Sequence, residues 1–364
     1  MYKISFCTVC MNRLVHLRET LLKNIQDNLD YPNLEFIVLD YNSKDGMENW
    51  GLANLSPYIE SGLVKYYKTY DPKFFALSHS KNIALKLATG DILCMIDSDN
   101  FAGEHYAAWV NKVFTQNGMN TIITTLRKDH IPFRDQGGKL CFSRELLHSV
   151  KGFDESLVGY GVEDVDLANR LEKAGGRRFF LEDDIYLKFI GHSTLDRLKN
   201  YYLINNLENL YIQVSESTGA ENKVLYLLKD GSFIHIKYEL KKSLKSNQIL
   251  SYHGWIIGDG GHRKGTFKRS SVNGLSLIFD DGSILMLGRE ENGIMTSQPN
   301  HNKDSWMKLS MEDDLYLELI MSYGECVNRA KCRKNDMESS AINNNGWGQA
   351  TVYRNFNRNE ATII

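Results

Sequence analysis

Two groups of carboxylates, far apart in the sequence, are the residues of this chain best suited to chemistry. Asp97 and Asp99 flank a single serine, and Glu163, Asp164 and Asp166 stand within four positions. Hard oxygen ligands of this kind suit Mg²⁺ or Mn²⁺, and a carboxylate can also act as a general base. Simpler interpretations exist for both groups. An Asp-x-Asp often only caps a strand or helix, and the second group could be the acidic first turn of a helix.

The segments beside these carboxylates indicate how they are positioned. The apolar run 92–96 predicts a buried strand that delivers Asp97 and Asp99 to its carboxyl end, where ligands of open α/β sheets bind. Residues 167–173 predict a helix after the second group. A divalent ion at the strand end would screen a diphosphate leaving group, while the second group supplies a base for an attacking hydroxyl. This combination indicates sugar transfer from a nucleotide.

Two further polar residues follow predicted strands. Asp40 ends the apolar run 36–39, and its carboxylate could accept the N–H of a uracil ring or could simply start a turn. Arg13 begins a predicted helix, where a guanidinium can hold phosphate or ribose oxygens, or can be an ordinary solvated residue. Glycines at 137, 138, 159 and 161 would let the backbone approach a donor sugar closely, although glycines are also common in turns.

Four ordered blocks of sequence carry a resemblance to a known family. They are VCMNRLVHL at 9–17, IVLDYNS at 37–43, SKNIA at 80–84 joined to DSD at 97–99, and GGKL at 137–140 continuing through GFD at 152–154 to GYGVED at 159–164. Residues 1–215 thereby resemble an inverting glycosyltransferase of the GT-A fold, family 2-like, whose second half is similar to β-1,4-galactosyltransferases and bacterial chondroitin-type polymerases. The chain departs from the pattern at Val9, where a proline is usual, and at Tyr41, where a second aspartate is frequent.

The resemblance implies roles for individual residues. Asp164 would be the catalytic base, with Glu163 as the second candidate and a partner for donor or acceptor hydroxyls. Residues from all four blocks would bind the nucleotide and donor sugar: Thr8, Val9, Cys10, Met11, Arg13, Asp40, Lys81, Asp97, Ser98, Gly137, Gly138, Tyr160 and Gly161. For Thr8, Val9, Cys10 and Met11, the backbone is expected to make the contact.

The same resemblance implies a Mn²⁺ or Mg²⁺ site formed by Asp99 and His192. His192 follows the strand-like segment 185–190, and a neutral imidazole is a reasonable Mn²⁺ ligand. Animal members of the galactosyltransferase group carry a methionine ligand three positions before this histidine. This chain has Phe189 there, which cannot coordinate a metal, so the preference between Mn²⁺ and Mg²⁺ stays open.

The composition agrees with a cytoplasmic enzyme. The 364 residues are 42% hydrophobic and 24% charged, which is enough for two domains with sizeable cores, and a net charge of −2 argues against nucleic acid as a partner. No signal peptide and no apolar run of about 18 residues is expected in this chain.

The six cysteines form no zinc pattern and are expected to be reduced. A basic, aromatic run at 197–202 is a candidate contact with the inner face of the membrane or an anionic acceptor, or a solvated helix face.

Beyond residue 215 the pattern changes to short alternating runs. Segments 224–228 and 233–236, and segments 275–279 and 284–287, each flank an Asp-Gly turn and predict β-hairpins. We expect a GT-A catalytic domain over residues 1–215, a β-rich accessory domain over 216–335 and a polar tail over 336–364. Aromatics at 252–255, and the loop 258–262, could bind glycan by stacking or belong to the core. The segment 311–323 predicts a closing helix or strand.

The sequence therefore favours an inverting, metal-dependent transferase with a UDP-sugar donor, galactose or N-acetylgalactosamine by resemblance. The acceptor would be a saccharide or a lipid-linked glycan in surface polysaccharide synthesis. Three alternatives stay open: a sugar nucleotidyltransferase, which would be expected to show a glycine-rich triphosphate loop that residues 8–18 lack, a retaining transferase, and a non-catalytic glycan-binding protein.

Overall fold

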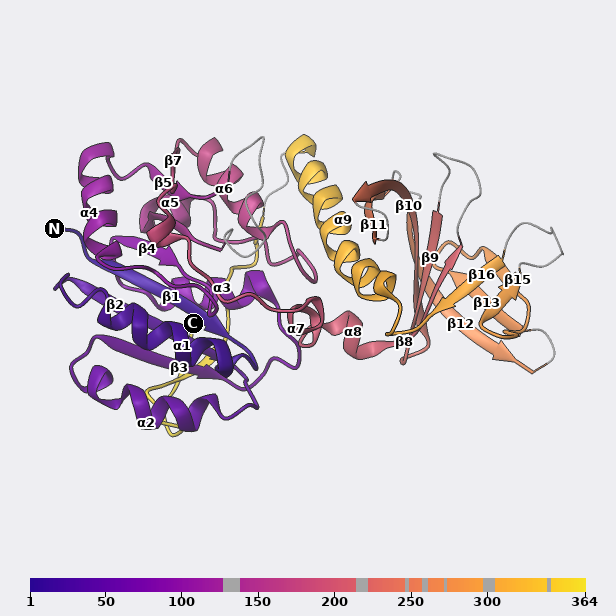
Figure 1. Ribbon diagram of the computed structural model, residues 1–364, viewed down its shortest axis with the longest axis horizontal. Helices are drawn as coiled ribbons and strands as arrows, with labels where there is room; N and C mark the ends of the chain where they lie inside the picture. Colours follow the sequence, from indigo (N-terminus) through magenta and orange to yellow (C-terminus); the bar gives the residue numbers. More distant parts are fainter. Residues whose placement is uncertain are drawn as a thin grey trace. The chain divides into compact units, whose positions relative to one another are not determined.

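The computed structural model describes residues 1–126, 138–213, 222–245, 249–256, 261–271, 274–296, 305–338 and 342–364 (Figure 1). The chain divides into two compact units. The first consists of Met1–Ser193 together with Cys332–Ile364, and the second is Thr194–Lys331. The expected boundaries were 215 and 335. In the structure residues 194–215 belong to the second unit, and the last residues of the chain return to the first.

The first unit is built on one mixed sheet with strand order β18-β17-β3-β2-β1-β4-β6-β5-β7. Its strands are β1 (Ile4–Cys10), β2 (Leu34–Tyr41), β3 (Val64–Thr69), β4 (Ile92–Met95), β5 (Thr121–Thr124), β6 (Leu140–Ser143), β7 (Arg177–Phe180), β17 (Thr351–Arg354) and β18 (Ala361–Ile363). Strands β3, β2, β1 and β4 are parallel, and β6 then runs antiparallel between β4 and β5. The carboxyl ends of the four parallel strands therefore share one edge, where open α/β sheets bind ligands.

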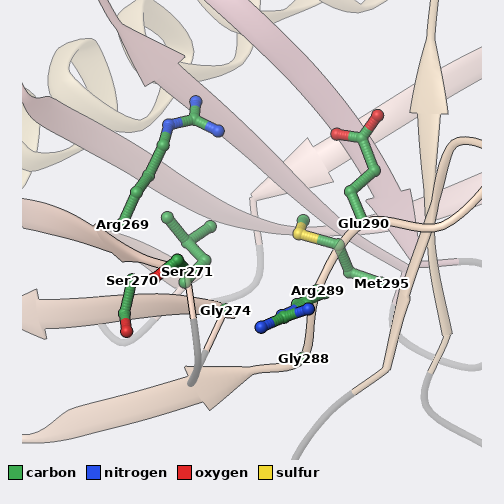
Figure 2. A pocket seen from close by; sticks show the side chains of 9 residues that line it. Arg269, Ser270, Ser271, Gly274, Gly288, Arg289, Glu290 and Met295 are labelled. Atoms are coloured by element: carbon green, nitrogen blue, oxygen red, sulfur yellow. The ribbon is translucent and has the colours of Figure 1, made fainter.

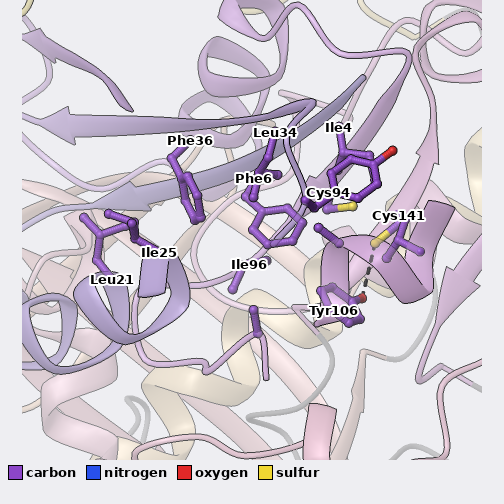
Figure 3. Packing of buried hydrophobic residues seen from close by; sticks show 14 of the residues in the cluster. Ile4, Phe6, Leu21, Ile25, Leu34, Phe36, Cys94, Ile96, Tyr106 and Cys141 are labelled. Carbon is purple, nitrogen blue, oxygen red and sulfur yellow. Dashed lines mark hydrogen bonds between the residues drawn. The ribbon is translucent and has the colours of Figure 1, made fainter. Parts of the chain in front are cut away.

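Helices cover both faces of this sheet because the strands are apolar on both sides. The helices are α1 (Leu14–Gln26), α2 (Met47–Glu60), α3 (Leu77–Leu87), α4 (Tyr106–Asn117), α5 (Arg144–Ser149) and α6 (Glu163–Lys173). One core cluster joins residues of α1, α2 and α4 to alternate residues of β1, such as Phe6, and the other joins α3, α5 and α6 to the intervening ones, such as Val9. In the first cluster Phe6 meets Phe36 edge to face, and the Tyr106 hydroxyl lies 3.3 Å from the Cys141 Sγ (Figure 3).

The segment after residue 341 is more ordered than the expected polar tail. Strand β17 pairs antiparallel with β3, and β18 extends the sheet beyond it. Phe356 stacks on Tyr66 of β3 with ring centroids 4.4 Å apart, and Val352 is fully buried. The packing of these apolar residues, which are scattered among polar ones, holds the end of the chain in the first unit.

The second unit begins with the short helices α7 (Thr194–Leu198) and α8 (Tyr202–Asn206) and is otherwise mainly antiparallel. Its strand order is β14-β13-β12-β10-β9-β8-β16-β15, with β11 paired to β10. The strands are β8 (Leu207–Gln213), β9 (Asn222–Leu228), β10 (Ser232–Lys245), β11 (Ile249–Ile256), β12 (His262–Ser270), β13 (Gly274–Phe279), β14 (Ile284–Leu287), β15 (Ile294–Thr296) and β16 (Ser305–Leu309). Both predicted hairpins are confirmed, as β9–β10 and β13–β14.

This second sheet curls until its two ends meet. The backbone N–H of Gly288, directly after β14, donates to the carbonyl of Thr296 at the end of β15, with N and O 2.7 Å apart. Side chains from both ends share one core, in which Leu287 and Met295 join the fully buried Trp306. The curl thus encloses an apolar interior and leaves a seam between β14 and β15.

Four further features of the described residues bear on the expectations from sequence. The segment 311–323 lies largely in helix α9 (Asp314–Glu338), whereas 185–190 is not the expected strand. It contains a 3₁₀ helix, Asp184–Tyr186, and an isolated bridge between Phe189 and Asn100. Among the described residues, no helix is long and apolar enough to cross a membrane, and all six cysteines are free thiols.

Candidate functional site

The turns that follow β1 and β2 interlock at the ligand edge of the sheet. Asn12 and Asn42 both adopt left-handed backbone conformations, with φ of 55° and 58°. The Asn12 amide oxygen accepts from the Lys44 backbone N–H at 2.6 Å, and the Asn12 N–H donates to the Ser43 hydroxyl at 3.0 Å. The first helical N–H of α1, on Leu14, is satisfied by the carboxylate of Asp45 at 2.7 Å. Arg13 is therefore held between two fixed turns.

Asp40 lies beneath these turns and not on their surface. Its side chain is 0% exposed, and its carboxylate accepts from the Ser43 N–H at 2.7 Å, the Tyr66 hydroxyl at 2.7 Å and the Lys68 ammonium at 2.8 Å. A carboxylate with three internal partners and no exposed surface cannot reach a uracil ring without rearrangement. The structure shows Asp40 holding the β2 turn, and its direct contact with a uracil base stays a prediction.

The side chains of the first block also point inward. Thr8 donates its hydroxyl to the Ile96 carbonyl at 2.9 Å, and Val9, Cys10 and Met11 are each at most 5% exposed. The burial of these four side chains favours the backbone of residues 8–11 for any contact with a ligand. Ser98 is likewise buried, and its carbonyl accepts from the Thr20 hydroxyl of α1 at 2.7 Å.

Lys81 joins the two carboxylate groups that sequence analysis singled out. Its side chain is only 1% exposed, and its ammonium lies 2.7 Å from the Asp164 carboxylate, 3.2 Å from that of Glu163 and 3.9 Å from that of Asp97. Helix α3 carries the lysine across the sheet face to this point. The sequence predicts that Lys81 binds the donor. In the structure, the Lys81 ammonium also joins the two acidic groups.

The charges in this cluster perturb one another. Burial raises the pKa of Asp164 to about 8, although the neighbouring Lys81 opposes the rise and Glu163 adds to it. Burial alone would lower the pKa of Lys81, but Asp164, Asp97 and Glu163 outweigh it and raise the pKa well above the ordinary value. Lys81 therefore stays charged, while Asp164 takes up a proton far more readily than an exposed aspartate.

The backbone that presents Asp164 is strained. Gly159 and Gly161 adopt φ of 66° and 95°, and Val162, which precedes α6, has φ of 80°. A left-handed conformation is rare for a β-branched residue and is typically maintained only where the surrounding structure imposes it. Glu163 and Asp164 then occupy the first turn of α6, where the helix dipole favours negative charge. Tyr160 lies in the same turn, between the two glycines.

Asp99 and His192 are brought together by a short antiparallel contact. The Ile190 N–H donates to the Asp99 carbonyl at 2.8 Å, and the Phe101 N–H donates to the Lys188 carbonyl at 3.0 Å. As a result His192 Nδ1 lies 3.3 Å from Asp99 Oδ2. Phe189 takes part through its backbone, which explains how this position can lack a metal-binding side chain and still align the histidine.

Arg13 occupies the other side of His192. Its guanidinium lies 3.1 Å from His192 Nε2 and 3.7 Å from Asp99 Oδ2. Because a guanidinium can only donate, Nε2 must accept, and a neutral His192 then carries its proton on Nδ1, facing Asp99. Binding of a metal through Nδ1 would require that proton to leave and the Arg13 contact to change.

The residues present otherwise fit a divalent cation. Two ligands at right angles in an octahedral Mg²⁺ shell are about 3 Å apart, close to the spacing of Asp99 and His192. Among the described residues of the site, the carboxyl groups of Asp97, Asp99, Glu163 and Asp164 outnumber the two cationic groups, Arg13 and Lys81, which favours a further cation. No group of three metal-ligating side chains occurs among the described residues, which leaves the remaining ligand positions for water or substrate oxygens.

Two neighbouring residues near the site are Gly138, which the sequence assigned to the donor site, and Lys139, which it gave no role. Gly138 packs so closely on the Asp97 carboxylate that a Cβ at this position would collide with it. The fully buried ammonium of Lys139 donates to the carbonyls of Phe101 and Tyr186, joining the segment after Asp99 to the segment before His192. Lys139 directly precedes the apolar strand β6, and this position gave no signal of such a function. Gly137, which was assigned to the donor site, lies outside the described residues.

A network around Asn82 holds the loop that leads to Glu163. The Asn82 amide accepts from the Phe153 N–H at 2.8 Å and donates to the Phe153 carbonyl and to Glu155. From the end of the chain, Asn343 donates to the Phe153 carbonyl at 2.7 Å, and the Gly348 N–H donates to Glu155 at 2.5 Å. The loop is thus fixed by hydrogen bonds that are buried at Asn82 and Phe153 and partly buried at Glu155 and Asn343.

Replacing Asn82 by Ala should lower the free energy of unfolding by about 2–3 kcal/mol, because it leaves the buried N–H of Phe153 without its partner and removes one of the two donors to the Phe153 carbonyl. Denaturant unfolding of the full chain measures this. Asn54→Ala is a matched control, since Asn54 is exposed on α2 and bonds only to the Trp50 carbonyl, and its change should stay within about 0.5 kcal/mol. Equal effects of the two substitutions would contradict the network.

Comparison with known sequence families gives two adjoining matches. Residues 5–131 match "Glycosyl transferase family 2", and residues 130–193 match "N-terminal domain of galactosyltransferase". Together these matches cover β1 to His192, including both carboxylate groups. No curated protein sequence matches the chain.

Solved structures with partial similarity include a mannosyltransferase and TarS. The mannosyltransferase PcManGT from Pyrobaculum calidifontis, in complex with GDP-Man and Mn²⁺, is 21% identical with a TM-score of 0.42, over 52% of this chain and 57% of its own. S. aureus TarS 1-349, in complex with UDP-GlcNAc, is 18% identical with a TM-score of 0.42, over 55% of this chain and 61% of its own. The chain thus spans less than two thirds of either structure.

Proposed function

We propose that this chain, a glycosyltransferase of the family 2-like, GT-A type, moves a hexose from a UDP-sugar to an acceptor hydroxyl with inversion at the anomeric carbon. Galactose or N-acetylgalactosamine is the favoured sugar, since residues 130–193 match a galactosyltransferase family. The acceptor is a saccharide or a lipid-linked glycan of a surface polysaccharide, and the reaction takes place in the cytoplasm. The observation that carries the proposal is the convergence of Asp97, Glu163 and Asp164 on the ammonium of Lys81.

Asp164 is the base in this reaction. The acceptor hydroxyl oxygen forms a bond to the anomeric carbon, the bond from that carbon to the diphosphate oxygen breaks, and UDP leaves with the electron pair. The hydroxyl proton passes to Asp164, whose pKa of about 8 suits it to take up a proton near neutral pH. Lys81 keeps this carboxylate oriented through its 2.7 Å contact, and Glu163 is left to accept hydrogen bonds from sugar hydroxyls.

The remaining residues bind the donor. The backbone of residues 8–11 and the guanidinium of Arg13 lie at the start of α1, a place that favours diphosphate oxygens. Asp97, Ser98, Gly138, Tyr160 and Gly161 surround the sugar and ribose. Asp40 fixes the β2 turn against which the uracil ring of the donor would lie.

Asp99 and His192 would hold a divalent cation, Mn²⁺ or Mg²⁺. Such an ion would supply positive charge for the diphosphate of the leaving group. Arg13, already within 4 Å of Asp99, is placed to contribute a second positive charge there. The excess of carboxylates over cationic groups in the cluster supports this assignment, because an added cation would relieve their repulsion.

A donor screen tests the function directly. We expect the purified full chain to release UDP from UDP-galactose or UDP-N-acetylgalactosamine when Mn²⁺ is added, and to do so far more slowly in the presence of EDTA. Calorimetry should show tighter binding of UDP than of GDP or CDP. Tighter binding of GDP, or UDP release that is equal with and without EDTA, would overturn the donor or the metal assignment respectively. NMR of the product decides between inversion and retention.

A further inference from the structure

The second unit holds a pocket at the seam of its curled sheet, with a volume of about 310 Å³. This is at the lower end of the range for small-molecule sites, and the mouths of curled sheets are frequent places for them. Leu275 and Met295, each 3% exposed, form an apolar floor. The hydroxyl-bearing Ser270 and Ser271 form part of the wall, from the end of β12. The pocket belongs to no part of the transferase site described above.

Three charged side chains complete the lining, Arg269, Arg289 and Glu290 (Figure 2). Arg269 pairs with Glu208 at 2.6 Å. Glu290 accepts from the Tyr211 hydroxyl at 2.5 Å and from Lys308 at 3.2 Å. Burial raises the pKa of Glu290, but these two hydrogen bonds outweigh it and hold the pKa below the ordinary value, so the carboxylate is charged.

Arg289 is the exception among these charges. Within the ranges that the structure describes, its guanidinium has no carboxylate partner, whereas Arg269 and Glu290 are each paired. Arg289 is exposed and lines the pocket, where Figure 2 labels it beside Gly288. The pocket therefore carries one positive charge that its own residues do not balance.

The chemistry of the lining defines the ligand class. A guanidinium offers two parallel N–H groups, which match the geometry of a carboxylate. Serine hydroxyls can donate and accept, and Glu290 can accept from a ligand hydroxyl, so a polyhydroxylated ring would find both kinds of partner. The floor of Leu275 and Met295 suits the C–H face of such a ring. A single unbalanced charge favours a monoanion, and Glu290 would repel a doubly charged phosphate.

We propose that this pocket binds a carboxylate-bearing sugar, a hexuronate unit of a saccharide, with its carboxylate on Arg289 and its hydroxyls on Ser271 and Glu290. The inference rests on the proposed function in assigning the ligand to saccharides. It gives the second unit a role in holding a glycan away from the site of transfer.

Ligand-detected NMR titration of the full chain tests this without any nucleotide. The probes are D-glucuronate and D-galacturonate, with D-glucose and inorganic phosphate as comparisons. At least one uronate should bind about tenfold more tightly than glucose or phosphate. Arg289→Ala should weaken uronate binding about tenfold or more, a loss equivalent to about 1.4 kcal/mol, and Arg289→Lys should restore it only in part.

Lys268→Ala is the matched control, because it removes one exposed positive charge from the same strand as Arg269 but does not line the pocket. Its uronate binding should equal that of the unchanged chain. Equal losses in Lys268→Ala and Arg289→Ala, phosphate binding as tight as that of uronate, or the absence of uronate binding would each overturn the proposal.

Measuring UDP release in the same samples separates this inference from the proposed function. Uronate binding without UDP release from any UDP-sugar would refute the proposed transfer and leave the pocket assignment intact. UDP release without uronate binding would refute the pocket assignment alone. Arg289→Ala should release UDP from the donor at the same rate as the unchanged chain, because its residue lies in the other unit.

Discussion

Replacing Asp164 by Asn is expected to lower turnover by on the order of 100-fold or more, with UDP affinity little changed. Asparagine keeps an oxygen for the Lys81 ammonium, 2.7 Å away, but cannot take up the acceptor proton. Steady-state rates together with calorimetric titration of UDP separate the two effects. Asp166→Asn serves as the control, since Asp166 pairs with Arg170 on the same helix, 2.8 Å away, and not with Lys81.

The pH dependence gives a second check on the same residue. A base must be deprotonated to act, and the pKa of Asp164 is raised to about 8, so turnover should rise with pH and reach half its maximum near pH 8. An ordinary aspartate would give that rise near pH 4. The rise should be absent from the residual rate of Asp164→Asn. Near-normal turnover in Asp164→Asn, together with an inactive Glu163→Gln, would transfer the role of base to Glu163.

Asp99→Ala should abolish the dependence of UDP binding on Mn²⁺ and weaken that binding to the level seen with EDTA. Its carboxylate faces His192 Nδ1 at 3.3 Å and is the only carboxylate in contact with that ring among the described residues. His192→Ala should show a partial loss, because Asp99 and the diphosphate oxygens would remain. Calorimetry of UDP with and without Mn²⁺ gives both results.

Asp91→Ala is the control for the loss of a carboxylate near β4. Asp91 stands before the same strand, at its opposite end, and accepts from the Lys3 N–H at 2.8 Å. Mn²⁺ should strengthen UDP binding to this variant as it does for the unchanged chain. Retention of the Mn²⁺ effect in Asp99→Ala would place the metal on other residues.

The sequence predicted the elements whose pattern is local. The apolar run before Asp97 is β4, the segment after Glu163 is α6, and the two Asp-Gly turns join hairpins, because each depends on residues that are neighbours in the chain. The mixed α/β sheet followed by antiparallel strands is confirmed for the same reason. These patterns located both carboxylate groups on the correct elements.

What the sequence could not show depends on contacts between distant residues. Nothing near Lys81 indicates that its ammonium is buried among three carboxylates from two other elements. Asp40 has the sequence context of an exposed turn residue, but Tyr66 and Lys68 of the neighbouring strand enclose it. The segment 185–190 is apolar enough for a strand, yet it pairs through a few backbone bonds with the residues after Asp97.

The return of the chain to the first unit affects the order in which that unit can be completed. Asn343 and Gly348, which bond to the loop before Glu163, follow the whole second unit in sequence, as do β17 and β18. During synthesis from the N-terminus, the loop before Glu163 is made first. Its partners Asn343 and Gly348 exist only after the whole second unit has been made. A fragment that ends at residue 331 would therefore retain every proposed catalytic side chain but lack the groups that fix this loop and the outer strands of the sheet.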